Sequence, residues 1–328
     1  MNKLRFLFRC VISIALIAFV LHKVNFAELG RDLSRIDWRL ALLASLLAPL
    51  MIASLAFRWR IFLRQQGIVL PYGTVFSLTW AGQFFNSCLP GSTGGDVVKI
   101  YQLCRLAPDR KARAAASVIV DRFSALVALA VLTVGALAID PAPLGKIEEL
   151  AGSAKYKLII LVSAVLAAAV AALILYHLVR STHWHGRLQR MYAALKTSLV
   201  ISPALFAAMA ISFGIHCLNF FIAFLFARAL GIGITYSQIL LIFPVVLLLV
   251  MFPVSVNGLG VREVLFTFYF NHLHIAFAGN TDANVANTVV ALSAVLFSND
   301  LLWSLPGGLW YVLRFKRVSP VLAKESSA

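Results

Sequence analysis

Two glycine-rich stretches interrupt the apolar sequence of this chain, one in each half. The first is NSCLPGSTGGDVVK at residues 86–99, and the second is FPVSVNGLGVRE at residues 252–263. Each contains a proline, an asparagine and closely spaced glycines, followed by residues of opposite charge. Non-helical backbone survives inside a bilayer only where protein or a wet cavity satisfies its polar groups. Matching breaks in the two halves therefore favour a transporter-like protein whose broken helices meet inside the membrane.

The composition supports a membrane location for the whole chain. Hydrophobic residues make up 61% of the 328 residues and charged residues only 13%, against about 25% charged in a typical soluble protein. The net charge is +16. Because the basic residues lie in short loops beside apolar runs, we interpret them as topology signals and contacts to anionic lipids, and we expect no nucleic-acid partner.

The apolar pattern predicts an all-α polytopic membrane protein. A helix needs about 20 apolar residues to cross the hydrocarbon layer. Two weaker regions, 74–105 and 236–276, each contain one break, and their apolar arms are short for a crossing. We therefore predict six full spans plus two re-entrant hairpins, although eight spans fit the loops equally well. The six full spans are predicted at 6–22, 39–57, 115–139, 158–178, 203–229 and 286–312.

The loop charges predict the topology. The N-terminus, the C-terminus and the loops at 58–73, 104–113 and 179–200 are rich in Lys and Arg, so we place them in the cytoplasm. The loop at 271–287 has neither residue and is placed outside. The halves, about 1–140 and 155–315 of a single domain 1–328, then have opposite orientations, as in an inverted-topology repeat. The predicted location is the inner (cytoplasmic) membrane.

Charged residues follow each break. Asp96 and Lys99 come directly after Gly94 and Gly95 and share one helix face. A helix start with exposed backbone N–H groups can hold an anion, and Lys99 can reach the same phosphate. In the second break, Arg262 and Glu263 follow Gly260 in the same way. The alternative is that both pairs are ion pairs that cap helices.

Other polar groups lie inside the predicted spans. Asp121 and Arg122 interrupt an apolar stretch, where they form either an interfacial salt bridge or charges that face a cavity. Arg58 closes the second span as an interfacial anchor or a phosphate ligand. Charged groups within spans are costly and usually mark a pathway. The candidate lipid-binding residues are Arg58, Asn86, Gly94, Gly95, Asp96, Lys99, Asp121, Arg122, Asn257, Gly258, Gly260, Arg262 and Glu263.

Enzyme motifs are missing from the sequence. It contains no HExxH, GxSxG or GxxxxGK[ST] pattern. We therefore predict no catalytic residues, no metal site and no cofactor. His216 and Asn219 lie one helical step apart and are expected to form interhelical hydrogen bonds. For Asp300, in the last span, the sequence indicates no partner.

The ordered set of motifs resembles a known family. Arg58-Trp59, the break at 86–99, Asp121-Arg122 and the stretch at 258–263 are similar to the flippase-like membrane region of lysylphosphatidylglycerol synthases and their stand-alone relatives. The resemblance implies a protein that handles polar lipids, in some members by moving an aminoacylated phospholipid between leaflets. The 328 residues contain no counterpart of the aminoacyl transferase domain, so we do not expect this chain to synthesise that lipid.

Three functions are compatible with these observations. The first is a flippase or transporter that moves a polar or anionic envelope lipid, such as a phospholipid or a polyprenyl-phosphate-linked sugar. The second is a membrane-embedded transferase that acts on a lipid-linked donor. The third is a non-transporting accessory subunit that works with envelope-biosynthesis enzymes. The opposite orientation of the halves favours the first, with membrane lipids as the principal partners.

Overall fold

The computed structural model describes residues 36–88, 94–139, 194–195, 202–250, 261–273, 275 and 285–315. Every regular element within these ranges is a helix, which confirms the all-α prediction. Among the described residues, four helices are long and apolar enough to cross a membrane. They correspond to the predicted spans at 39–57, 115–139, 203–229 and 286–312. The predicted spans at 6–22 and 158–178 lie outside the described residues.

Short sequence signals set the bounds of the long helices. Helix α3 covers Trp38–Gln65, and the Asp37 carboxylate accepts hydrogen bonds from the N–H groups of its first turn. Helix α10 covers Pro203–Ala229 and begins with a Ser202 cap followed by proline at its first position. Helix α6 covers Lys111–Ile139, and α13 covers Val285–Trp310 and continues as a π-helical turn, η3, at Tyr311–Phe315.

Helices α3 and α10 end in turns of the same type. Gly67 follows α3 with φ of 72°, and Gly231 follows α10 with φ of 73°. In both turns the next N–H group reaches back to a carbonyl of the last helical turn, from Ile68 to Leu63 and from Ile232 to Ala227. This is the Schellman arrangement, in which glycine supplies the left-handed conformation. The two glycines are 164 residues apart in the sequence.

A tyrosine contact repeats at the same spacing. The Tyr72 hydroxyl donates to the carbonyl of Ala53 at 2.9 Å, and the Tyr236 hydroxyl donates to the carbonyl of Cys217 at 3.0 Å. Both the donors and the acceptors are again 164 residues apart. Each tyrosine begins the next helix and ties it back to the long helix before it, so the two halves of the chain share a local design.

The short helices form two hairpins. Helix α4, Tyr72–Cys88, packs against α5, Gly94–Leu106, and α11, Tyr236–Val250, packs against α12, Val261–His272. At 1.5 Å per residue these helices are about 18–26 Å long, less than the hydrocarbon thickness of about 30 Å. The arms are therefore short, as predicted, although α4 begins at Tyr72, just before the predicted region 74–105. Residues 89–93 and 251–260, which join the arms, lie outside the described ranges. A short 3-10 helix, Pro108–Arg110, links α5 to α6.

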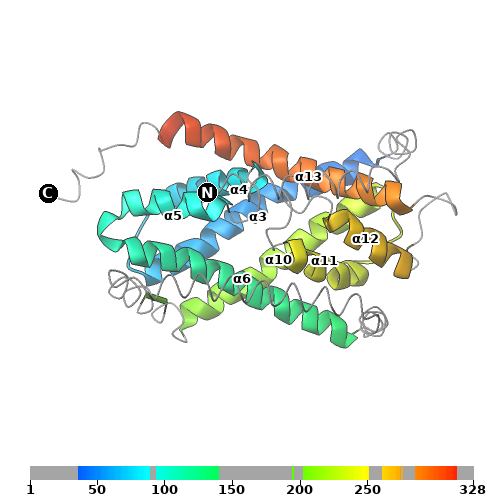
Figure 1. The fold of residues 1–328 in the computed structure, drawn as a ribbon, viewed down its shortest axis with the longest axis horizontal. Helices are drawn as coiled ribbons and strands as arrows, with labels where there is room; N and C mark the ends of the chain where they lie inside the picture. Colours follow the sequence, from blue (N-terminus) through cyan, green and yellow to red (C-terminus); the bar gives the residue numbers. More distant parts are fainter. Residues whose placement is uncertain are drawn as a thin grey trace, which may run out of the picture.

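The two hairpins lie at opposite ends of the helical body (Figure 1). Helix α13 runs along one side and α6 along the other, with α3 and α10 packed against each other between them. Each hairpin contacts long helices of both halves: α5 packs on α6 and α4 on α13, while α12 packs on α13 and α11 on α6. Gly307 permits the close approach of α13, because a Cβ there would lie 2.3 Å from the carbonyl oxygen of Trp80.

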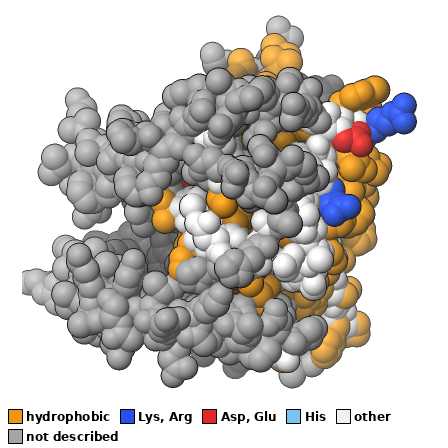
Figure 2. Space-filling view, turned by 90° about the vertical axis from the view of Figure 1, so that its right-hand side faces the viewer, with side chains coloured by type: hydrophobic (Ala, Val, Ile, Leu, Met, Phe, Trp, Pro, Cys, Tyr) orange, Lys and Arg blue, Asp and Glu red, His pale blue; other side chains and the backbone are white. Residues whose placement is uncertain are grey.

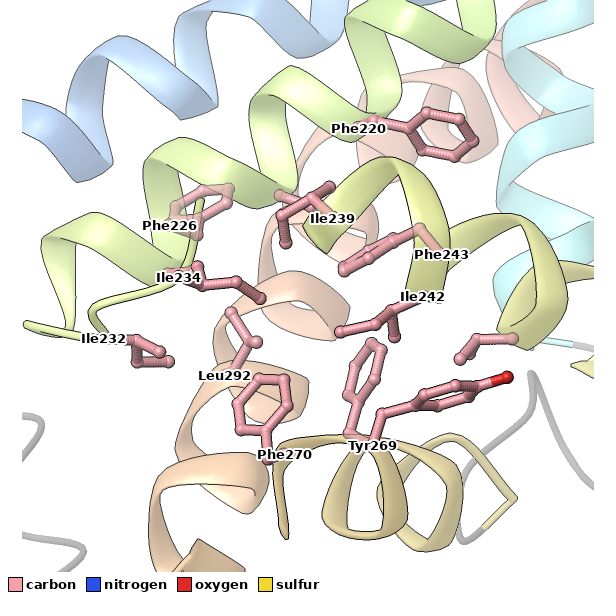
Figure 3. Close-up of a cluster of buried hydrophobic side chains, with 14 of the residues drawn as sticks. Phe220, Phe226, Ile232, Ile234, Ile239, Ile242, Phe243, Tyr269, Phe270 and Leu292 are labelled. Atoms are coloured by element: carbon pink, nitrogen blue, oxygen red, sulfur yellow. The ribbon is translucent and has the colours of Figure 1, made fainter. Parts of the chain in front are cut away.

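Each half has its own hydrophobic cluster. The larger joins α10, α11, α12 and α13, and Figure 3 shows Phe220, Phe243 and Phe270 among its buried side chains, with Phe220 next to Phe243. A smaller cluster around Trp59 and Leu78 joins α3, α4, α5 and α6. Outward-facing leucines of α3 remain exposed, as expected for a lipid-facing surface. Figure 2 likewise shows mainly hydrophobic side chains among the described residues of one face.

Candidate functional site

The start of α5 is held against α4 at closest backbone contact. A Cβ on Gly95 would lie 1.9 Å from the carbonyl oxygen of Gly82, so neither helix has room for a side chain there. The side-chain oxygen of Asn86 accepts a hydrogen bond of 2.7 Å from the Gly95 N–H, and its amide group donates to Gln83. Asn86 therefore satisfies one of the free N–H groups at the start of α5.

Asp96 forms a bidentate ion pair with Arg122. The Arg122 Nε and Nη2 atoms donate to the two carboxylate oxygens of Asp96 at 2.6 and 2.9 Å. This geometry is the strongest common form of a carboxylate contact. It joins the first turn of α5 to the middle of α6, and it shows that Arg122 pairs with the break, not with its neighbour Asp121.

Asp121 instead pairs with Arg58 on α3. Arg58 Nε donates to the Asp121 carboxylate at 2.8 Å, and Arg58 Nη1 donates to the Ser212 hydroxyl of α10 at 3.1 Å. Both charged side chains are buried. The pair connects three long helices inside the protein, so the interpretation of Arg58 as an interfacial anchor is wrong.

Lys99 is buried close to these two pairs. Its Nζ lies 5.1 Å from the centre of the Trp59 ring, a cation–π distance. The charges of Asp96, Asp121, Arg122 and Arg58 all act on it. Three cations and two carboxylates leave this five-residue group, which we call the first charge cluster, with one net positive charge. Such a cluster attracts an anion.

The second break forms a smaller polar group. Arg262 donates to the hydroxyl and carbonyl oxygens of Ser293 on α13, at 2.9 and 3.0 Å. The Ser293 hydroxyl in turn donates to the Glu263 carboxylate. Ser293 therefore bridges the two oppositely charged residues of α12, which the sequence placed together without identifying what lies between them.

Two adjoining cavities lie between the two hairpins. The larger, of about 290 Å³, is lined by Arg122, Gln83 and Asn86 together with residues of α3, α10 and α13. The smaller, of about 120 Å³, is lined by Arg262 and by residues of α10 to α13. The shared lining residues are Met51, Asn219, Leu247 and Asp300. The walls of both cavities are mostly apolar, with Arg122 in the larger, Arg262 in the smaller, and Asn219 and Asp300 in both.

The structure brings most of the predicted site residues together. Gly94 starts α5, and Arg58, Asn86, Gly95, Asp96, Lys99, Asp121 and Arg122 lie in or beside the first charge cluster. Arg262 lines the smaller cavity, and Glu263 is buried beside it. The predicted residues Asn257, Gly258 and Gly260 lie outside the described ranges. His216 forms the expected interhelical bond, to the carbonyl of Ala125 at 2.9 Å.

Several polar contacts were not predicted from the sequence. Ser212 accepts a hydrogen bond from Arg58, and Ser293 accepts one from Arg262, in each case between two helices. Gln83 accepts one from Asn86 within α4. Serine and glutamine occur in many helices without binding a ligand, so their identity alone carries no signal. Ser212 and Ser293 are distinguished only by their positions opposite Arg58 and Arg262, which depend on helix packing, whereas Gln83 lies three residues before Asn86 on the same helix.

Comparison with known families identifies the kind of protein. Residues 6–280 match the model of the lysylphosphatidylglycerol synthase TM region. The chain belongs to this family. The match spans both hairpins and confirms the resemblance inferred from the motifs. None of the curated proteins compared with the chain matches it. Membership of this family, together with the apolar helices, makes the chain a multi-pass membrane protein with a role connected to membrane lipids.

Proposed function

We propose that this member of the lysylphosphatidylglycerol synthase TM family is an inner-membrane flippase that moves a polar or anionic envelope lipid between leaflets. The observation that carries the proposal is the cavity of about 290 Å³ between α3, α4, α6, α10 and α13, whose mostly apolar wall includes Arg122 of the first charge cluster together with Gln83 and Asn86. The surrounding helices are apolar on their outer faces. A lipid headgroup therefore has a polar site available within the membrane body.

The charge of the site supports an anionic headgroup. The first charge cluster carries one net positive charge, and Arg122 has a planar guanidinium suited to phosphate oxygens. Arg262 lines the adjoining cavity near the other hairpin. Phospholipids and polyprenyl-phosphate-linked sugars both have the required phosphate group, so they are the proposed substrates.

The packing of the halves supports an inverted-topology repeat. The matching turns at Gly67 and Gly231 and the matching tyrosine contacts share one spacing along the chain. The contacts between helices are also reciprocal, since α4 packs on α13 where α11 packs on α6. Repeats of this kind open alternately to the two sides of the membrane by rocking against each other. The N- and C-termini lie in the cytoplasm in this proposal.

The proposed movement requires neither catalysis nor nucleotide hydrolysis. Energy comes from the lipid gradient, the membrane potential or a coupled ion. Potential supplies about 2.3 kcal/mol per charge per 100 mV. The competing roles, a membrane-embedded transferase or an accessory subunit of envelope synthesis, differ in what the purified protein does alone. The transferase produces a modified lipid, and the accessory subunit moves none.

Reconstitution tests the proposal. Purified protein in nucleotide-free vesicles is supplied with trace fluorescent lipids that differ in headgroup, and a membrane-impermeant quencher reports movement between leaflets. We expect faster movement of a phosphate-bearing lipid than in protein-free vesicles. Arg122→Gln should slow it at least tenfold, whereas Arg113→Gln, an exposed position on the same helix, should not. Movement that is equal in all three proteins, or no movement at all, contradicts the proposal.

A further inference from the structure

Asp300 is an accessible carboxylate on the wall of the two cavities, and it has no partner among the described residues. It lies in the membrane-spanning part of α13 and lines both cavities at their junction. Among the described residues, no hydrogen bond or ion pair reaches its side chain. The other carboxylates of the two breaks and of α6 do have partners. Asp96 and Asp121 are ion-paired, and Glu263 accepts a hydrogen bond from Ser293. An unpaired charge at this depth is costly unless it has a function.

The neighbouring groups offer oxygen but little compensating charge. The side-chain oxygen of Asn299 is buried without a hydrogen-bond partner and lines the smaller cavity. Asn219 faces both cavities beside Asp300. A buried acceptor without a donor indicates a missing donor, because native proteins rarely leave such groups unsatisfied.

The charged groups that face Asp300 come from three helices. Arg122 of α6 and His216 of α10 line the larger cavity with it, and Arg262 of α12 lines the smaller one. Arg262 is the cation whose charge acts on Asp300. Glu263 lies on the same helix as Arg262 and is bonded to Ser293. The residues that α3 and α4 contribute to the cavity walls are all uncharged.

We propose that Asp300 binds and releases a proton as the headgroup passes between the two hairpins, which couples lipid movement to the proton gradient. Its position places it on the wall of both cavities, so the proposed rocking of the halves would expose it to each side in turn. Protonation removes the negative charge that repels an anionic headgroup, and deprotonation restores it. This inference rests on the proposed flippase function and names its energy source.

The site fits a proton better than a metal cation. A sodium ion must exchange its hydration water for several oxygen ligands, as in channel filters. The described residues at the junction offer one carboxylate and two amide side chains, and the Arg262 guanidinium adds a fixed positive charge beside them. A proton requires only one carboxylate oxygen, so it is the favoured ligand.

Chemical labelling tests the site without any assay of transport. Dicyclohexylcarbodiimide reacts with protonated carboxyl groups in apolar surroundings, and peptide mass analysis locates the product. We expect labelling of Asp300 that decreases as the pH is raised, while the ion-paired Asp96 and Asp121 stay unlabelled in the same digest. Labelling of Asp300 that is independent of pH, or absent, contradicts the inference. Protection by sodium at constant pH indicates a sodium site and contradicts it as well.

Transport measurements test the coupling. One unit of pH gradient biases the lipid distribution by up to about tenfold for each proton carried. In vesicles, an imposed pH gradient should accelerate lipid movement by wild-type protein. Asp300→Asn should still move lipid, without any response to the gradient. An equal response in wild type and Asp300→Asn overturns the coupling but leaves the flippase function intact. Absence of movement by wild type contradicts the flippase function, and the coupling with it.

Discussion

Arg58 is buried in α3, and its charge is balanced by Asp121 across the helix interface. Replacing Arg58 by Met leaves the Asp121 carboxylate without a counter-ion. Breaking a buried pair in this way costs about 3–5 kcal/mol of folding free energy. We therefore expect a clear decrease in the thermal unfolding midpoint of the detergent-solubilised protein.

Two comparison variants make the Arg58 prediction specific. Arg64→Gln changes an exposed arginine of the same helix and should change stability by no more than about 0.5 kcal/mol. The double variant Arg58→Met with Asp121→Leu removes both charges, so it should recover most of the lost stability. If the double variant is less stable than Arg58→Met alone, the two residues do not stabilise each other as described.

At the residue scale, the sequence predicted which side chains matter better than it predicted their partners. Asp121 and Arg122 are adjacent, so a mutual salt bridge or a shared cavity position was the natural alternative. Neighbours on a helix point about 100° apart, however, and each meets a different helix. Arg58 reaches Asp121 and Asp96 reaches Arg122 only because α3, α5 and α6 pack around one point.

At the element scale, the first hairpin depends on the contact between Gly95 and Gly82. Gly95→Ala places a methyl group where the Gly82 carbonyl now lies, so α4 and α5 must separate. Overpacking of this kind costs about 1–3 kcal/mol. It also stretches the hydrogen bond from Gly95 to Asn86. We expect a lower unfolding midpoint and slower lipid movement in the reconstituted assay.

Gly73→Ala is the matched control for the hairpin. Gly73 lies on α4, and a methyl group added to it would meet no atom within 4 Å, so alanine fits there. Because alanine favours helix over glycine by up to about 1 kcal/mol, stability should stay equal or rise. Equal loss of stability in Gly73→Ala and Gly95→Ala contradicts the role given to the contact between the two helices.

The helix bounds and the two matching turns show which sequence patterns predicted the fold and which were missed. Apolar length predicted the long helices, but 39–57 was too short because Arg58 is buried and the helix continues past it through Arg60 and Arg64. A pattern was overlooked at 64–72 and 228–236, where Arg, Gly, Ile and Tyr recur at equal spacing. It marks the shared turn and tyrosine contact, and hydropathy alone does not detect it.

At the scale of the whole molecule, the proposed inverted topology puts equivalent turns on opposite sides of the membrane. Val69 and Gly233 are exposed in the two turns and are 164 residues apart. In a variant without the four native cysteines, Val69→Cys should react with an impermeant thiol reagent only from the cytoplasmic side. Gly233→Cys should react only from the outside. Labelling of both from one side contradicts the inverted arrangement.

The overall architecture was only partly predictable from one sequence. Loop charges gave an orientation for each half, but they cannot separate a re-entrant hairpin from two short crossings, because both return the chain to the same side. The described hairpin helices are shorter than the hydrocarbon layer, which favours the re-entrant form. The cavities were beyond prediction, since they depend on how α3, α10 and the hairpins pack together.

The shared turn after α3 and α10 also bears on ancestry. Arg58 and Trp59 of α3 correspond, by the 164-residue spacing, to Ile222 and Ala223 of α10. The turn and the tyrosine contact are common to both halves, whereas the buried side chains at these corresponding positions differ. Under the proposed inverted topology, an ancestral unit of half this size would insert in both orientations and form an antiparallel pair with two copies of every group. After fusion of two such genes, the two copies can change independently. The first half here contains the Arg58–Asp121 ion pair, and the second contains the larger aromatic cluster.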